Sequence, residues 1–225
     1  MNTAIEIALF ALPAIIAITF HEAAHGFVAR HFGDDTAEKR GRLTLNPLKH
    51  IDPVGTILLP AMLLLTHTGF IFGYAKPVPV NPNALLNPRR DMVWVAAAGP
   101  AMNLLLAMVS FALIWPAARM GEAAGHWVVP ILLNSILINI LLAVFNLIPP
   151  PPLDGGKVAV GLLPNTLAVP LAKLNQFGFL ILLVVFVVLP MVGEKIGVNL
   201  NLFQMLVQPP LHAVMGAVRW MMPNS

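Results

Sequence analysis

The stretch AIEIALFALPAIIAITFHEAAH, residues 4–25, decides how the rest of the chain is interpreted. Residues 4–20 are almost wholly apolar, and the run continues without a turn signal into His21, Glu22 and His25. An apolar run of this length predicts a helix that spans a membrane. Ionisable groups are costly at the end of such a helix, so they indicate a functional site.

The spacing of these polar residues indicates the kind of site. His21 and His25 are four residues apart and therefore share one helix face, where both imidazoles can bind one metal ion. Glu22 lies beside them and can act as general base toward a zinc-activated water. The alternative is a polar helix end at the membrane interface, which needs no further partner elsewhere in the chain.

The composition of the 225-residue chain is that of an integral membrane protein. It is 58% hydrophobic and 10% charged, with a mean hydropathy of +0.81, whereas soluble domains are about 25% charged. The chain has no cysteine, which excludes disulfides and thiolate zinc sites. We interpret the net charge of +3 through its distribution and expect no nucleic-acid partner. The N-terminus has no basic region, so we expect no cleavable signal.

Long apolar runs predict an all-α, polytopic helical bundle with a re-entrant segment and short strand elements near the active site. We expect a single domain over residues 1–225, with a catalytic core at about 4–160 and C-terminal helices at about 174–222. Residues 198–222 fit either a kinked span or an interfacial helix. The predicted spans cover about residues 4–32, 92–118, 127–148 and 174–192.

Two stretches predict the strand elements. Leu43 and Leu45 alternate with polar neighbours, which is a weak strand signal. The stretch KPVPV, residues 76–80, contains alternating prolines that favour extended backbone and lack amide donors. It therefore suits an edge strand or the wall of a groove.

A catalytic zinc ion normally has three protein ligands, so the two histidines need a third partner. Asp154 is the strongest candidate, because it follows the proline run 149–152 at the end of a predicted span and precedes two glycines. Its alternative is a simple turn residue, since Pro-x-Asp-Gly is a good turn signal. We take Asp154 as the third ligand of one Zn²⁺ per chain. We expect the remaining histidines to be interfacial or packing residues; they are His31, His50, His67, His126 and His212.

This ligand set constrains the topology, because the two motifs must meet at one end of the bilayer. One apolar segment between them must not cross, and residues 51–72, which prolines and glycines interrupt, fit a re-entrant element best. Only Arg119 and Lys195 then lie on the far side, with Arg219 unassigned. The positive-inside rule places the site toward the cytoplasm and the N-terminus outside. The near side receives ten basic residues: Arg30, Lys39, Arg40, Arg42, Lys49, Lys76, Arg89, Arg90, Lys157 and Lys173.

With these motifs in place, the chain resembles a small bacterial site-2 protease, an intramembrane zinc metalloprotease. Besides His21 to His25, the stretch from Asn146 to Gly156 resembles the family's N-x-x-P-x-x-x-L-D-G motif. Residues 98–103 resemble its G-x-x-x-N element. Nothing in the chain resembles the PDZ or nucleotide-sensing domains of some relatives.

The resemblance implies roles for further residues. Asn146 would help to hold the substrate or transition state, and Gly99 and Asn103 would allow close packing near the site. For both asparagines the alternative is interhelical hydrogen bonding. The stretch from Lys76 to Val80 would pair with an unwound substrate by β-strand addition.

The resemblance also implies a setting and a class of substrate. The partners would be transmembrane proteins or remnant signal peptides in the lipid bilayer of a bacterial inner membrane. A transporter that moves metal ions or protons through the same buried cluster is the alternative function. Its expected signature of internal repeats is not visible in the sequence.

Overall fold

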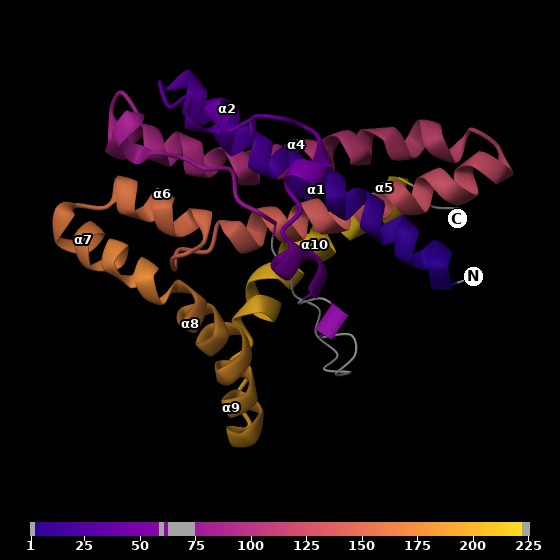
Figure 1. Ribbon diagram of the computed structural model, residues 1–225. Helices are drawn as coiled ribbons and strands as arrows, with labels where there is room; N and C mark the ends of the chain where they lie inside the picture. Colours follow the sequence, from indigo (N-terminus) through magenta and orange to yellow (C-terminus); the bar gives the residue numbers. More distant parts are fainter. Residues whose placement is uncertain (1–2, 59–60, 63–74, 222–225) are drawn as a thin grey trace.

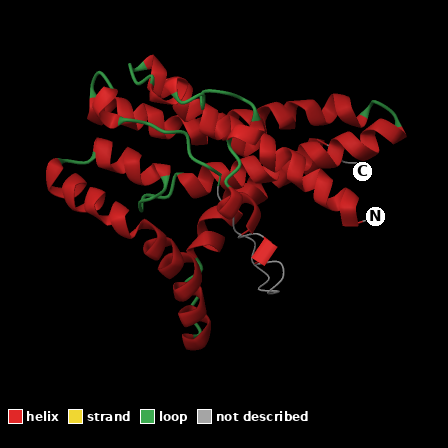
Figure 2. Ribbon diagram, viewed as in Figure 1, coloured by secondary structure: helices red, strands yellow, loops and turns green. Residues whose placement is uncertain are grey.

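The computed structural model describes residues 3–58, 61–62 and 75–221 of the chain. Within these ranges the protein is helical and contains no β-strand (Figure 2). The expected strand elements at Leu43 to Leu45 and at residues 76–80 are therefore wrong: both stretches are irregular. Residues 76–80 have no ladder because two prolines lack amide donors. The Lys76 amide donates to the His50 carbonyl oxygen, and the Val78 amide donates to the Glu22 side chain.

Three long helices form the main bundle: α1 (Thr3–His31), α4 (Pro88–Ala118) and α5 (Glu122–Asn146). Each contains a stretch long and apolar enough to cross a membrane. The three pack against one another in pairs (Figure 1). The first three predicted spans are thereby confirmed as helices.

Helix α4 begins one turn before the predicted span for a local reason. Pro88 occupies its first turn, where a missing amide hydrogen costs nothing. Asp91 then accepts a hydrogen bond from the Asn87 amide at 2.6 Å, which satisfies a group at the helix start. At its other end, the Arg119 guanidinium lies 3.3 Å from the centre of the Trp115 ring.

The apolar core of the bundle lies between α4, α5 and α10 (Leu202–Met221). Ile114 and Ile136 are fully buried there, and Val218 of α10 packs against them. Helix α10 is continuous through Pro209 and Pro210. It is not among the described helices that are both long and apolar enough to cross a membrane.

The chain between α5 and α10 forms a bent arm, and the fourth span predicted at about residues 174–192 includes the bend. Together the two helical stretches of the arm are apolar enough for a broken span or a re-entrant loop. The helical stretches Asn165–Phe177 and Leu180–Ile196 meet at 83°, and Figure 1 shows the second of them pointing away from the bundle. Hydropathy reports the length of an apolar run but not the direction of its axis. The arm consists of α6 (Asp154–Leu162), α7 (Asn165–Lys173), η4 (Leu174–Phe177), α8 (Gly178–Leu183), η5 (Val184–Val188) and α9 (Leu189–Ile196).

Short elements connect α1 to α4. They are α2 (Thr36–Lys39), η1 (Pro47–Lys49), η2 (Pro53–Leu58) and η3 (Pro82–Ala84). Most of residues 51–72, the segment expected to be re-entrant, lies outside the described residues.

Candidate metal centre

The structure brings His21 and His25 of α1 together with Asp154, the first residue of α6. The Nε2 atoms of the two histidines are 3.1 Å apart, and each lies 3.2 Å from Asp154 Oδ2. All three residues are at least nine-tenths buried. Two residues from one helix turn thus meet a carboxylate more than a hundred residues later in the chain.

The dimensions of this triangle fit a small divalent ion. Donor atoms at about 2.0–2.1 Å from a tetrahedral zinc ion are about 3.3 Å from one another, close to the observed 3.1 and 3.2 Å. Two histidines with one carboxylate are also a ligand set of catalytic zinc sites. Among the described residues, this cluster is the group of His, Cys, Asp or Glu side chains arranged to hold a metal ion.

The hydrogen bonds at the Nδ1 atoms of the two imidazoles also indicate a metal site. His21 Nδ1 lies 2.6 Å from Asn103 Oδ1, and His25 Nδ1 lies 2.6 Å from the Val95 carbonyl oxygen. Both partners are acceptors, so both Nδ1 atoms carry the proton. In the neutral form that binds metal, the two rings then direct their Nε2 lone pairs toward each other and toward a carboxylate. Such an arrangement is repulsive unless a cation lies among the three atoms.

A buried chain of amides fixes the orientation of Asn103. Its side-chain nitrogen donates to Asn139 Oδ1 at 2.8 Å and to the Ala17 carbonyl oxygen at 3.2 Å. Asn139 in turn donates to the Ser135 carbonyl oxygen at 2.8 Å. Because a backbone carbonyl can only accept, each amide has one possible orientation, and Asn103 must present its oxygen to His21.

Gly99 lies against both imidazoles. A Cβ atom at this position would be 2.5 Å from His21 Nε2 and from His25 Nε2. No side chain fits there, so the close packing that we expected at Gly99 is present. Asn103, one turn later, does more than pack, since it bonds directly to His21.

Two glycines after Asp154 let its helix approach the site. A Cβ atom on Gly155 would collide with the backbone of Leu147, and one on Gly156 would be 2.7 Å from the Pro151 nitrogen. The start of α6 therefore packs directly on the turn that ends α5. This contact places Asp154 opposite α1.

The second oxygen of Asp154 faces away from the histidines. Lys157 Nζ lies 3.0 Å from Asp154 Oδ1, while Oδ2 faces the imidazoles. The Lys157 ammonium group stabilises the ionised form of Asp154, which is the form that can serve as an anionic metal ligand.

Glu22 faces the same cavity without joining the metal triangle. Its Oε2 atom accepts a hydrogen bond from the Val78 amide at 2.8 Å. The cavity has a volume of about 560 Å³, and Glu22, His21, His25 and Asp154 all line it. Its remaining wall is largely apolar and comes from residues 77–82, α4, α6 and α7.

The other predicted site residue, Asn146, and the remaining histidines with described side chains lie outside the metal cluster. Asn146 lines the cavity, but its side-chain nitrogen donates to Leu142 of its own helix at 3.0 Å. None of the other histidines with described side chains joins the cluster: His50 is buried against Thr44, His31 packs on Phe32, and His212 is exposed. His67 and the side chain of His126 lie outside the described part of the chain.

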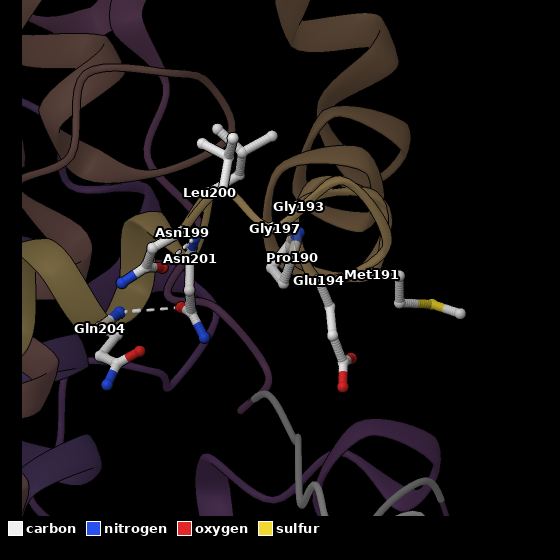
Figure 3. A pocket seen from close by; sticks show the side chains of 10 residues that line it. Pro190, Met191, Gly193, Glu194, Gly197, Asn199, Leu200, Asn201 and Gln204 are labelled. Atoms are coloured by element: carbon white, nitrogen blue, oxygen red, sulfur yellow. Dashed lines mark hydrogen bonds between the residues drawn. The ribbon is translucent and has the colours of Figure 1, made fainter.

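A second hollow, of about 440 Å³, lies where α9 meets the following loop (Figure 3). Its asparagines are used in local turns, as in the bond from the Gln204 amide to Asn201 Oδ1 that Figure 3 draws. Glu194 is the one titratable group among its described lining residues. This hollow therefore has no set of groups for metal binding or acid–base chemistry.

Three features of the centre did not emerge from the sequence: Asn139, the Val78 amide and Lys157. Asn139 carried a usable signal, because a polar residue within an apolar span is functional by default. A backbone amide carries no such signal, and Lys157 was counted only as a charge.

The chain is similar to several known proteins. Residues 116–189 match peptidase family M50. YwhC of Bacillus subtilis is 39% identical over 208 residues, covering 88% of this chain and 91% of that protein. Rip2 of Mycolicibacterium smegmatis is 35% identical over 178 residues, covering 77% of this chain and 64% of that protein. Rip2 of Mycobacterium tuberculosis is 33% identical over 195 residues, covering 85% and 71%. All three are named as zinc metalloproteases. No solved structure matches the chain.

Proposed function

Because the chain belongs to peptidase family M50, the family of the site-2 proteases, we propose that it cleaves peptide bonds within or next to transmembrane segments. That the protein is a metalloprotease of the membrane follows from the family and from its apolar helices. The location of the cleaved bond rests on one observation. Glu22 and the cluster of His21, His25 and Asp154 share a cavity at the end of an apolar helix.

In this proposal His21, His25 and Asp154 hold one zinc ion per chain. Bound zinc supplies a Lewis acid that lowers the pKa of water and polarises a carbonyl group. The residues behind the ligands keep them in place: Asn103 and the Val95 carbonyl oxygen hold the two rings, and Lys157 holds the second carboxylate oxygen.

Glu22 is the general base. It takes a proton from the attacking water as the oxygen forms its bond to the scissile carbonyl carbon. It then delivers that proton to the departing amide nitrogen as the carbon–nitrogen bond breaks, so the products are a carboxylic acid and an amine, between which the second proton of the water then moves to give a carboxylate and an ammonium group. The Val78 amide holds one Glu22 oxygen, which orients the carboxylate toward the cavity.

The substrate in this proposal is an extended apolar peptide. The cavity wall offers apolar side chains, among them Val80, Met92 and Val160. The amide of Val80 has no partner among the described residues, so a substrate strand can pair with it. Asn146 lies on the same wall and would help to hold the peptide. Transmembrane segments and remnant signal peptides both have this chemistry once their helices are unwound.

We place the protein in a bacterial inner membrane with the site toward the cytoplasm, on the strength of the ten basic residues near the site against two on the far side. The absence of cysteine allows a clean test with single-cysteine variants and a membrane-impermeant maleimide. In intact cells Met120→Cys should react, whereas Lys39→Cys should react only after permeabilisation. The reverse pattern would overturn this orientation.

Replacing the proposed base tests the mechanism. Glu22→Gln should retain zinc but lose cleavage of a single-span peptide reconstituted with the enzyme in detergent. Glu194→Gln, in the second hollow, is the matched control and should retain full activity. Asp154→Ala should lose zinc by elemental analysis. Full activity of Glu22→Gln would eliminate its role, and unchanged zinc content of Asp154→Ala would place the third ligand elsewhere.

The inactive Glu22→Gln variant also serves to identify substrates. Because it retains the cavity and the zinc ligands, it should hold a substrate without cleaving it, and mass spectrometry of the captured proteins would name the class. The transporter alternative finds no support in the comparisons, since the matched family is a peptidase family.

A further inference from the structure

We propose that Arg42 is a positioning residue for Glu22 and acts through the single peptide group that joins Pro77 to Val78. The inference rests on the proposed role of Glu22 as general base. Arg42 lies in the loop after α2, and its hydrogen bonds to described residues go to backbone carbonyls outside the metal cluster.

The two ends of one peptide group connect the guanidinium to the carboxylate. Arg42 Nη2 donates to the Lys76 carbonyl oxygen at 2.7 Å and to the Pro77 carbonyl oxygen at 3.4 Å. The Val78 amide, on the other side of the Pro77 peptide group, donates to Glu22 Oε2 at 2.8 Å. A trans peptide group points its oxygen and its hydrogen in opposite directions. Arg42 and Glu22 therefore hold the same plane from opposite sides.

The neighbouring prolines make this plane stiff. The ring of Pro77 fixes the φ angle of that residue, just before the peptide plane. Pro79 restricts Val78 to extended conformations, because its ring crowds the preceding residue. Pro77 and Pro79 have no amide hydrogen, so Val78 supplies the one amide donor between residues 77 and 79. This amide donates its hydrogen bond to Glu22 Oε2.

Packing on α1 fixes the position of the plane. The Val78 side chain is buried, and a Cβ atom on Gly26 would lie 3.0 Å from it and 3.0 Å from the side chain of Leu43. Gly26 is one helical turn after Glu22, and Leu43 follows Arg42. The loop, the proline segment and α1 thus meet at one point beside the base.

The burial of Arg42 also indicates a role beyond local stability. The side chain is 9% exposed, and its Nε atom is buried with no partner among the described residues. Burying a guanidinium with an unsatisfied nitrogen is unfavourable. A cation at the carbonyl end of a peptide group polarises it and makes its amide a stronger donor. Arg42 therefore strengthens the bond that orients Glu22.

A spectroscopic experiment tests this connection without a substrate. Labelling proline carbonyls with ¹³C and valine amides with ¹⁵N selects Pro–Val pairs, and the chain contains three of them, ending at Val54, Val78 and Val80. Of these three signals, the one whose chemical shift changes in Glu22→Gln is assigned to Val78. In Arg42→Met the same signal should move upfield in its proton dimension, while Val54 stays unchanged.

Two further variants complete the spectroscopic test. Arg42→Lys keeps the charge and should restore most of the Val78 shift. Arg40→Met, at an exposed arginine in the same loop, is the matched control and should leave all three signals in place. If Arg42→Met does not purify, Arg42→Gln makes the same test, since it retains a donor but no charge. A Val78 chemical shift that is unchanged when Arg42 is replaced overturns the proposal.

Kinetics separate positioning from substrate binding. With a single-span peptide that the wild type cleaves, Arg42→Met should lower kcat roughly 10- to 100-fold, with KM and zinc content unchanged. In the Glu22→Gln background the same substitution should have no further effect on the residual rate. An effect on KM alone would overturn the proposal. Full activity of Glu22→Gln would instead eliminate the proposed function, so the two failures are distinguishable.

Discussion

Adding one methyl group at Gly99 should disable the metal centre. The Cβ atom of Gly99→Ala would lie 2.5 Å from His21 Cε1, His21 Nε2 and His25 Nε2. Ordinary contact begins at 3.4 Å, so both rings must move by about 0.9 Å or α4 must move away from α1. The rings cannot move freely, because each is held at Nδ1 by a 2.6 Å hydrogen bond.

The size of this effect follows from the dimensions of the cluster. A shift of about 0.9 Å is large compared with a donor triangle whose edges are 3.1 and 3.2 Å. Disturbing the orientation of a metal ligand typically costs 10- to 100-fold in metal affinity, and we expect roughly the upper end. Overpacking should also lower the stability by about 1–3 kcal/mol.

Zinc affinity of the purified protein, measured in detergent by competition with a chelating dye, is the direct assay. Thermal unfolding of the metal-free protein reports the packing cost separately. Gly216→Ala is the matched control, because that glycine lies in α10 with no neighbouring atom within 4 Å of its added Cβ. Wild-type zinc affinity in Gly99→Ala, together with wild-type activity, would refute the argument that this glycine sets the geometry of the ligands.

Two further substitutions test the amide chain behind His21 and the stability that Asp34 contributes to the fold. Asn139→Leu removes an acceptor from Asn103, so we expect zinc affinity to fall by about 10-fold, and an unchanged affinity would show that the amide chain is dispensable. Asp34 accepts bonds from the Thr36 and Asn81 amides; burial raises its pKa, but these bonds and the Lys39 charge lower it more, to below its ordinary value. The stability that Asp34 contributes is therefore fully present above its unfolded pKa of about 3.9 and is lost as the pH falls through the lower folded value. Asp34→Asn should destabilise the protein by about 1–3 kcal/mol at pH 7, and thermal unfolding should show this difference shrinking below about pH 4; a difference that does not depend on pH would contradict this reasoning.

The proline segment illustrates why part of the fold was beyond prediction from local patterns. Alternating prolines at 77 and 79 predicted extended backbone and an edge strand, but this stretch is irregular and forms no strand. Most of its hydrogen bonds go to side chains: Arg42 binds two carbonyls, Glu22 accepts the Val78 amide, and Asp34 accepts the Asn81 amide. The Lys76 amide donates to the His50 carbonyl oxygen. A local pattern predicts backbone shape, whereas the partners come from distant parts of the chain.

The apolar arm shows a similar limit. Its hydropathy predicted a fourth span at about 174–192, and this range includes an 83° bend between Asn165–Phe177 and Leu180–Ile196 that hydropathy did not predict. Helix length and composition are local properties. The angle between two helices depends on the side chains that pack at their junction, which hydropathy does not report.

The sequence by itself determined the membrane class, the three long helices and the residues of the metal cluster. It could do so because helical spacing pairs His21 with His25, and because ionisable groups in apolar surroundings are rare and therefore conspicuous. Only the tertiary structure decided how these residues are held. The tautomer of His21 depends on Asn103 and Asn139 from two other helices. The orientation of Glu22 depends on the Val78 amide, 56 residues away. Hydrogen-bond partners of this kind are set by which surfaces pack together, and no local pattern of residues encodes them.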